Sequence, residues 1–278
     1  MNTYGFRIVN VFALSRLAGN PLCVFEDARG LDDATMQALA LQFNLSETTF
    51  ILPSARATAQ VRIFTPTFEM AFAGHPTLGT AHVVRSLRDT GDSVTLEMKA
   101  GIIPVQAQGD AWTLSANPPK HRAPRASREA LATMLGLAPG DLVDRPLWVD
   151  TGSEQLVIPL ATRDAVERAS PNPELMLRIA ADEARAMAYV FARDGDSVLA
   201  RFFFPQHGAL IEDPGTGSAC ANLGGWLLAN GAPLPLELSI DQGAAVNRPC
   251  RLGLRVTQDS RILVSGNVIE LGRGSLTL

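Results

Sequence analysis

The chain has 278 residues, 46% of them hydrophobic and 19% charged, a balance that is typical of a globular protein with one large or two ordinary domains. This composition excludes disordered and fibrous proteins. Lysine and arginine number 24 against 28 aspartate and glutamate, giving a net charge of -4 with no long basic run, so no nucleic-acid partner is expected and a small polar ligand fits better.

The three cysteines and the first ten residues are used to predict the cellular compartment. Cys23, Cys220 and Cys250 are isolated, without a CxxC pair, which favours neither a disulfide framework nor a zinc site and predicts a reducing, cytoplasmic setting. The opening MNTYGFRIVN lacks the charged start and apolar core of a signal peptide. The longest uncharged stretch, 215–236, is broken by glycine, asparagine and proline, so no membrane segment is predicted.

The first half begins with two extended segments, FRIVNVFAL at 6–14 and PLCVFE at 21–26, followed by a helical pattern at 32–43. Met36, Leu39, Ala40 and Phe43 share one helix face, with two aspartates at the start where acids suit the helix dipole. This pattern predicts a buried amphipathic helix.

The second half repeats this order. Two extended segments at 146–151 and 155–160 follow a short helix at 127–136 that Gly136 closes. A longer helix is then expected over 173–187, with Leu175, Ile179 and Met187 on its apolar side.

Sliding the chain along itself reveals an internal repeat at an offset of half the chain length. This offset aligns TTFIL at 48–52 with MAYVF at 187–191. The single residues that it matches are Arg62, Phe64, Pro66 and Thr77, with Arg201, Phe203, Pro205 and Thr216. We infer two similar domains that face each other across a cleft.

The predicted fold class is α+β, with two similar pseudo-symmetric domains, each a mixed sheet wrapped around a central helix. Strands outnumber helices and do not alternate strictly with them, which argues against a doubly wound parallel sheet. The proline-rich and basic stretch 116–127 is interpreted as the linker. The N-terminal half is expected at 1–118, joined by a final strand at about 268–278, and the C-terminal half at 119–267. Neither GxGxxG after a strand nor GxxxxGK[ST] is present.

Two glycine-containing loops are candidates for ligand binding. In FEMAFAGHPTLGTAHVV, Pro76 fits the first helical position and His75 the cap; in ALIEDPGTGSACANLGGWLL, Asp213 stands before Pro214 at a similar cap position. Two such helix starts could hold a small carboxylate through their backbone N–H groups. Alternatively, His75 is a turn residue and Asp213 only a helix cap, but their occurrence in matching loops favours function.

Glu47, in NLSETTF, is a third candidate, with Ser46 before it and no cation nearby in sequence. It could be a solvated turn glutamate, the default for this residue type. At the mouth of an apolar cleft, however, a carboxyl group could take up a proton and return it. The residues alone leave both interpretations open.

With these loops identified, the chain resembles the PhzF family of phenazine-biosynthesis isomerases, which share the fold of diaminopimelate epimerase. The resemblance runs from VNVFALSRLAGNPLCVFED through NLSETTFIL and RIFTPTFEMAFAGHPTLGTA to IEDPGTGSA and VSGNVIELGRGSLTL. It implies two α+β halves, with the last strand returning to the first domain.

The resemblance also implies roles for matching residues. Glu47 would be the acid/base that moves a proton, and no organic or metal cofactor is implied. It further implies a small-molecule carboxylate as substrate and a homodimer as the assembly. The residues expected to bind the substrate are Ser46, Gly74, His75, Asp213, Gly217 and Ser218.

The family implies an isomerase that abstracts a proton at one ring carbon of trans-2,3-dihydro-3-hydroxyanthranilate and delivers it to another. Relatives of the same fold racemise their substrates with two thiols, one at each of the paired loops. Here the two positions hold Ala73 and Pro214, so we hypothesise that this protein does not racemise a substrate with two thiols. Two alternatives remain open: a non-catalytic metabolite-binding module of the same fold, and an epimerase or isomerase of another small carboxylate.

Overall fold

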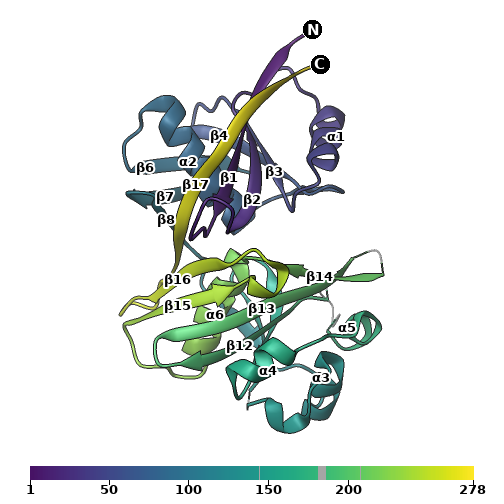
Figure 1. Ribbon diagram of the computed structural model, residues 1–278. Helices are drawn as coiled ribbons and strands as arrows, with labels where there is room; N and C mark the ends of the chain where they lie inside the picture. Colours follow the sequence, from purple (N-terminus) through teal and green to yellow (C-terminus); the bar gives the residue numbers. More distant parts are fainter. Residues whose placement is uncertain (144, 181–185, 207) are drawn as a thin grey trace. The chain divides into compact units, whose positions relative to one another are not determined.

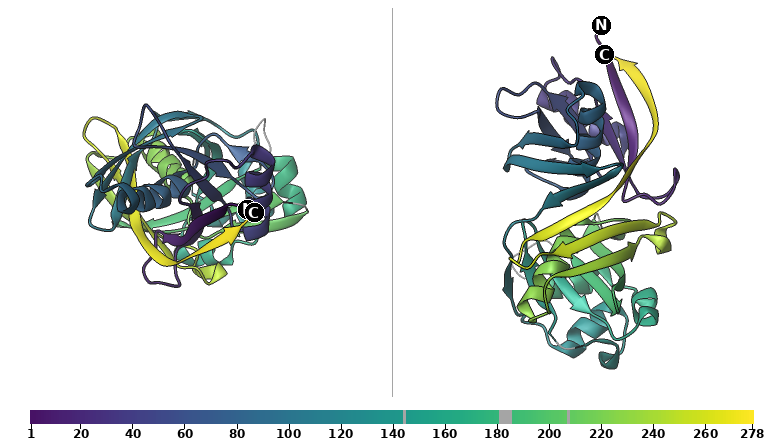
Figure 2. Two further views of the ribbon diagram at one scale, coloured as in Figure 1. Left: turned by 90° about the horizontal axis from the view of Figure 1, so that it is seen from above. Right: turned by 90° about the vertical axis from the view of Figure 1, so that its left-hand side faces the viewer.

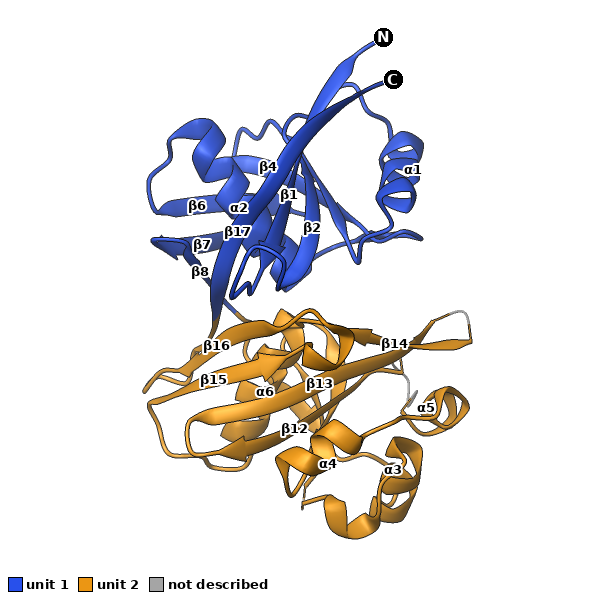
Figure 3. Cartoon of the chain, in the orientation of Figure 1, with its two compact units in different colours: residues 1–115, 265–278 blue, residues 116–264 orange. Residues whose placement is uncertain are grey.

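The structure, a computed structural model, describes residues 1–143, 145–180, 186–206 and 208–278. The chain forms two compact units (Figure 3): unit 1 contains residues 1–115 and 265–278, and unit 2 contains residues 116–264. In the part of the chain that is described, no helix is both long and apolar enough to cross a bilayer.

Unit 1 contains two helices and a mixed sheet. Its elements are β1 (Thr3–Val11), β2 (Asn20–Phe25), α1 (Asp33–Phe43), β3 (Thr48–Leu52), β4 (Ala59–Phe64), β5 (Glu69–Met70), α2 (Gly74–Arg88), β6 (Ser93–Met98), β7 (Gly101–Gln108), β8 (Ala111–Ser115) and the larger part of β17 (Ile262–Thr277). Asp32 caps α1 by accepting from the Thr35 backbone N–H, and the left-handed Asn44 ends it.

The strands of unit 1 close into a ring. β1 pairs antiparallel with β2 and with β17, β2 pairs parallel with β3, and β3 pairs antiparallel with β4. β4 then pairs parallel with β6, which leads through β7 to β8, and β8 pairs with β17. Because the last strand returns to the first, this part of the sheet is a barrel.

Helix α2 lies within this barrel and contacts β1, β2, β3, β4, β6, β7 and β8. Residues 74–81, 83 and 84 are buried. Gly79 permits the close approach, since a Cβ there would lie 2.6 Å from Leu22 Cδ2 and 2.9 Å from Val11 Cγ2. The barrel therefore holds the start of α2, with His75, in a tightly packed interior.

The two chain ends lie side by side in unit 1 (Figures 1 and 2). Asn2 and Leu278 exchange backbone hydrogen bonds of 2.9 and 3.0 Å, and Thr3 pairs with Thr277 at the start of the β1–β17 ladder. The C-terminal strand is thus an integral part of the first unit's sheet.

Unit 2 contains more helix than unit 1. Its elements are β9 (Lys120–Arg122), α3 (Arg128–Leu135), the 3₁₀ turn η1 (Pro139–Asp141), β10 (Leu147–Asp150), β11 (Glu154–Pro159), α4 (Arg163–Arg168), α5 (Pro173–Ile179), β12 (Ala188–Asp194), β13 (Ser197–Gln206), β14 (Ala209–Asp213), α6 (Gly217–Ala229), β15 (Leu236–Gln242), the 3₁₀ turn η2 (Ala244–Val246) and β16 (Cys250–Val256). α6 packs on β9, β10, β11 and β16.

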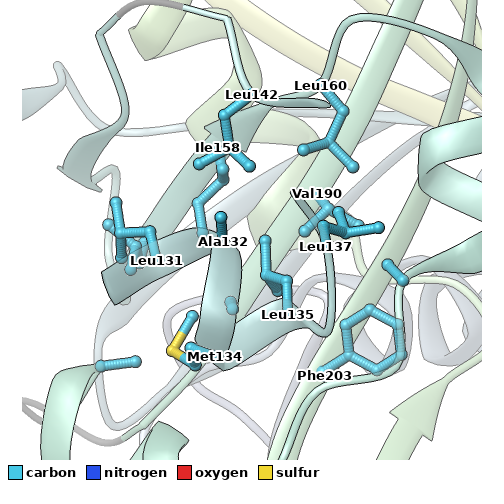
Figure 4. Close-up of a cluster of buried hydrophobic side chains, with 14 of the residues drawn as sticks. Leu131, Ala132, Met134, Leu135, Leu137, Leu142, Ile158, Leu160, Val190 and Phe203 are labelled. Carbon is cyan, nitrogen blue, oxygen red and sulfur yellow. The ribbon is translucent and has the colours of Figure 1, made fainter. Parts of the chain in front are cut away.

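A large apolar cluster in unit 2 packs α3 against the sheet (Figure 4). Leu131, Met134 and Leu135 of α3 and Phe203 of β13 are at most 1% exposed. Ser127 caps α3 and the left-handed Gly136 closes it, which confirms the predicted short helix and its end.

The same order of strand pairings occurs in both units. β10, β11, β12, β13, β15 and β16 repeat the antiparallel and parallel sequence of β1, β2, β3, β4, β6 and β7. The repeat extends to side chains: Arg62 binds Glu69 through both carboxylate oxygens and lies over Phe64, while Arg201 binds Glu212 in the same way and lies over Phe203.

A constant offset of half the chain length holds for β4 and β13 but is wrong elsewhere. Phe64 and Phe203 correspond, as expected. Thr48 pairs with Phe64, however, and Ala188 pairs with Phe203, so Thr48 corresponds to Ala188 and not to Met187, the residue that the constant offset assigns to it. Turns of different length in the two units change the offset from element to element.

The helix predicted over 173–187 is shorter in the structure. α5 ends at Ile179, with Ala180 as its C-cap, and Met187 directly precedes β12 rather than lying on a helix. Residues 181–185 of the predicted helix lie outside the described residues. Leu175 and Ile179 do pack on the apolar cluster, as expected.

Candidate active site

Glu47 and His75 lie next to each other in unit 1. Glu47 directly precedes β3, and His75 is the second residue of α2. Glu47 Oε2 lies 3.5 Å from His75 Nε2, and the side chains are 15% and 7% exposed. The sequence predicted both residues separately, and the fold of unit 1 brings them together.

His75 is a buried, neutral imidazole. Burial lowers its pKa from 6.5 to about 3, while a hydrogen bond with the Pro21 backbone acts in the opposite direction and is weaker. Asn20 Nδ2 lies 3.5 Å from Nδ1. The approach of Nε2 to Glu47 lacks hydrogen-bond geometry, and Nε2 has no hydrogen-bond partner among the described residues. Near neutral pH, His75 therefore places no positive charge beside the Glu47 carboxylate.

The lowered pKa of His75 predicts a pH dependence of stability. Between about pH 3 and 6.5, the unfolded chain binds a proton at His75 that the folded chain does not. The contribution of neutral His75 to the free energy of unfolding is therefore complete above about pH 6.5 and is lost as the pH falls toward 3. Relative to His75→Gln, the wild type should lose up to about 1.4 kcal/mol per pH unit in that range. Urea unfolding at several pH values measures this difference. Histidine NMR signals showing protonation of folded His75 near pH 6.5 would contradict it.

Asp213 ends β14 in unit 2 and belongs to a buried polar cluster. The Thr216 hydroxyl donates a short hydrogen bond to Asp213 Oδ2. Gln242, 1% exposed, donates from Nε2 to the Asp213 carbonyl at 2.8 Å and to Thr216 Oγ1 at 3.0 Å. The Thr216 N–H faces Gln242 Oε1 at 3.4 Å. Because Thr216 Oγ1 accepts from Gln242, its own proton points to Asp213 Oδ2, which accepts it.

Gly243 holds the same loop close to β15. Its backbone is left-handed, with φ of 81°, and a Cβ there would lie 2.4 Å from the Pro214 carbonyl oxygen. Gln242 and Gly243 together therefore fix the loop that joins β14 to α6.

Gly217 and Ser218 are the first two residues of α6. Gly217 is buried and Ser218 is partly exposed. Ser218 Oγ accepts a hydrogen bond of 2.9 Å from Gln155 Nε2, at the start of β11. In unit 1, Gly74 opens α2 in the same way, whereas Ser46 is exposed beside Glu47.

The helix caps predicted at these loops are wrong. Ala73 is the N-cap of α2, so Pro76 lies at the third helical position, and Thr216 is the N-cap of α6, so Asp213 lies before the cap. Neither helix has a side-chain cap hydrogen bond or an acidic residue in its first turn. The α-helices α1, α3, α4 and α5 each have both features. The starts of α2 and α6 thus leave backbone N–H groups for another acceptor.

The predicted site residues fall into two groups. Ser46, Glu47, Gly74 and His75 lie in unit 1, and the rest, Asp213, Gly217 and Ser218, lie in unit 2. Sequence reasoning missed the amide side chains that contact them, which are Asn20, Gln155 and Gln242, and also Asn222, which contacts Gln155. One signal was present: Asn222 follows Ser218 by four residues, so both lie on one helix face.

The thiols are unsuited to acid/base work. Cys23, Cys220 and Cys250 are all buried, and burial raises the pKa of each; that of Cys250 reaches about 12, with Asp213 adding to the rise. Ala73 caps α2 and Pro214 follows β14, so no thiol stands at either place. Among the described residues, no cluster of three or more histidine, cysteine, aspartate or glutamate side chains could hold a metal ion.

Comparison with known proteins agrees with the resemblance. The PhzC-PhzF family model, described as phenazine biosynthesis-like protein, matches residues 9–274. An uncharacterized isomerase of Pasteurella multocida is 37% identical over 99% of this chain and 95% of its own. A trans-2,3-dihydro-3-hydroxyanthranilate isomerase of Pseudomonas fluorescens is 33% identical over 99% of this chain and 100% of its own.

Solved structures show the same fold. A PhzF-family phenazine biosynthesis protein of Bacillus anthracis is 27% identical, with a TM-score of 0.88 and full coverage of both chains. A hydroxyproline epimerase of Agrobacterium vitis, 14% identical, has a TM-score of 0.65 over 99% of this chain and 91% of its own, which shows a shared fold alone.

The mixed sheet, the two central helices and these similarities define an isomerase of the PhzF type. The chain belongs to the PhzC-PhzF family of phenazine biosynthesis-like proteins.

Proposed function

We propose that the protein is a cofactor-independent isomerase that moves a proton within a small cyclic or unsaturated amino or hydroxy acid. The first candidate substrate is trans-2,3-dihydro-3-hydroxyanthranilate, the compound in the names of relatives that are 32% to 33% identical. An isomerase or epimerase acting on another small carboxylate is the alternative. The relatives' names as isomerases favour an enzyme over a non-catalytic binding module.

The contact of Glu47 with a neutral His75 carries this proposal. A general base must be ionised to take a proton and must hold that proton long enough to return it. His75 adds no charge to the pair, so Glu47 is the group that gains and loses the proton. The buried Nε2 of His75, without a hydrogen-bond partner in the described chain, supplies a polar contact for the substrate.

The reaction needs no oxidant or reductant. Glu47 removes a proton from one ring carbon, and the electron pair of the broken C–H bond delocalises over the conjugated substrate. The same carboxyl group, now protonated, gives the proton to a second carbon, and a carboxylate is restored. Ser46, Gly74, Asp213, Gly217 and Ser218 bind the substrate. Backbone N–H groups at the starts of α2 and α6 stabilise the negative charge that develops on it.

The repeated strand order supports further parts of the proposal. We propose that the two compact units are the pseudo-symmetric domains of a diaminopimelate epimerase-like fold, with β17 completing the first. We also propose a homodimer, the commonest symmetric assembly of soluble proteins, in the cytoplasm, with neither nucleic acid nor membrane as a partner.

Proton NMR of the purified protein with trans-2,3-dihydro-3-hydroxyanthranilate tests the substrate. The expected result is loss of the substrate ring signals and appearance of an isomer. The same sample should not racemise L-proline or diaminopimelate, because no thiol occupies the Ala73 or Pro214 positions. A folded protein that leaves the first compound unchanged would refute the named substrate, and proline racemisation would refute the exclusion of thiol chemistry.

A further inference from the structure

Behind Ser218, a row of buried polar side chains runs through unit 2. Asn222, on α6, is fully buried, and Gln155, on β11, is 1% exposed. Asn222 Nδ2 donates to Gln155 Oε1 at 2.9 Å, and Gln155 Nε2 donates to Ser218 Oγ at 2.9 Å. At the far end, Thr151 donates to Asn222 Oδ1 from its backbone N–H at 3.0 Å and from its hydroxyl at 2.7 Å.

Backbone groups fix the direction of every hydrogen bond in this row. The Thr151 N–H can only donate, so the atom that faces it must be the oxygen of Asn222. The Ser153 carbonyl can only accept, and it lies 2.9 Å from Asn222 Nδ2. Asn222 must therefore donate to Gln155, which places the oxygen of Gln155 toward Asn222 and its amide nitrogen toward Ser218.

The hydrogen bond from Gln155 determines where the hydroxyl proton of Ser218 can point. A hydroxyl group has one proton and two lone pairs, and one lone pair of Ser218 is occupied by Gln155. Its proton must point elsewhere, and no acceptor for it is found among the described residues of the chain. Ser218 is partly exposed at the first turn of α6, beside N–H groups that have no side-chain cap.

We propose that Gln155 is a positioning residue that holds the Ser218 hydroxyl as a hydrogen-bond donor for a carboxylate oxygen of the substrate, with Asn222 and Thr151 fixing the amide of Gln155. This inference rests on the proposed function only in naming the substrate carboxylate as the acceptor. The serine proton and the helix N–H groups all donate, so this position favours an oxygen with lone pairs over an ammonium group.

Steady-state kinetics with Gln155→Met, in wild-type and Ser218→Ala backgrounds, test the role of Gln155. Methionine keeps the volume and removes the donor. Because the hydrogen bond is made in both the ground state and the transition state, KM should rise about tenfold while kcat stays within twofold. In the Ser218→Ala background, Gln155→Met should change KM less than about twofold, since its effect passes through Ser218.

Gln106→Met is the matched control. Gln106 Nε2 donates to Ser93 Oγ at the same distance, 2.9 Å, but on the exposed surface of unit 1, so this variant should leave KM unchanged. The proposal is wrong if Gln155→Met leaves KM at the wild-type value, or if it raises KM equally in both backgrounds.

Neutron diffraction of the deuterated protein decides the hydrogen-bond direction independently of turnover. A deuteron on Gln155 Nε2 should point to Ser218 Oγ, and the deuteron on Ser218 Oγ should point away from Gln155. A serine deuteron pointing to Gln155 would overturn the inference even in an active enzyme. If the protein turns over no tested carboxylate but shows the expected deuterons, the named substrate fails while the orientation of Ser218 stands.

Discussion

Glu47→Gln should lower kcat for isomerisation by about 10³-fold, because glutamine cannot take up and return a proton, and general acid–base catalysis typically contributes a factor of this size. Glutamine is isosteric with glutamate, so the contact with His75 and the start of β3 are kept. The rate of substrate loss and the urea unfolding curve are measured on the same preparation. Together they separate an effect on the reaction from an effect on folding.

Two comparisons make this result specific. Glu167→Gln, on the exposed side of α4, removes the same charge far along the chain from the candidate residues and should leave kcat within twofold of the wild type. Glu47→Asp keeps a carboxylate but withdraws it by one methylene, so it should retain more activity than Glu47→Gln. Equal kcat values for the wild type and Glu47→Gln would remove Glu47 from the reaction.

Arg201→Met should lower the free energy of unfolding by about 3 kcal/mol, the range for breaking a buried ion pair. Arg201 binds Glu212 through two hydrogen bonds of 3.1 and 2.7 Å, and both side chains are at most 15% exposed. Its Nη1 also donates to the carbonyls of Val166, Glu167 and Ala169, at the end of α4. Methionine would leave the Glu212 charge buried and these carbonyls without their donor.

Arg251→Met is the control for charge removal. Arg251 pairs with Asp241 at 2.9 Å, but the side chains are 53% and 35% exposed, and such pairs contribute about 0 to 1 kcal/mol. Urea unfolding followed by tryptophan fluorescence measures both variants, since Trp148 is fully buried in unit 2. Equal losses of stability in the two variants would contradict the structural role given to Arg201.

The arginines also show what the sequence could predict. Arg62 and Arg201 were matched by the internal repeat, and the structure gives them the same partners on β5 and β14. Periodicity predicted the buried face of α1, where Met36, Leu39 and Ala40 lie inside. These features depend on local spacing, which the sequence displays directly.

A single sequence offset could not predict the register of the paired strands. Strand pairing is set by hydrogen bonds between distant segments, and a one-residue shift turns a side chain to the other face of the sheet. By the β3–β4 and β12–β13 registers, the residue in unit 2 that corresponds to Glu47 is Met187. Unit 2 therefore has no carboxylate at the position that corresponds to Glu47, and the internal repeat gave no information about the role of Glu47.

The candidate site was predictable in its residues but not in its contacts. The proximity of Glu47 and His75 depends on β3 and α2 meeting in the barrel, although β4 and β5 separate these two elements along the chain. Burial of the His75 ring, which keeps it neutral, follows from packing within unit 1. The polar row behind Ser218 joins β11 to α6 and likewise exists only in the folded unit.

The most direct measurement is proton NMR of trans-2,3-dihydro-3-hydroxyanthranilate in D₂O with the wild type and with Glu47→Gln. If the single carboxyl group of Glu47 moves the proton, the wild type should remove the proton from one ring carbon and supply a proton or deuteron to another. Glu47→Gln should leave both carbon positions unchanged. Isomerisation or deuterium exchange by folded Glu47→Gln at the wild-type rate would contradict the account.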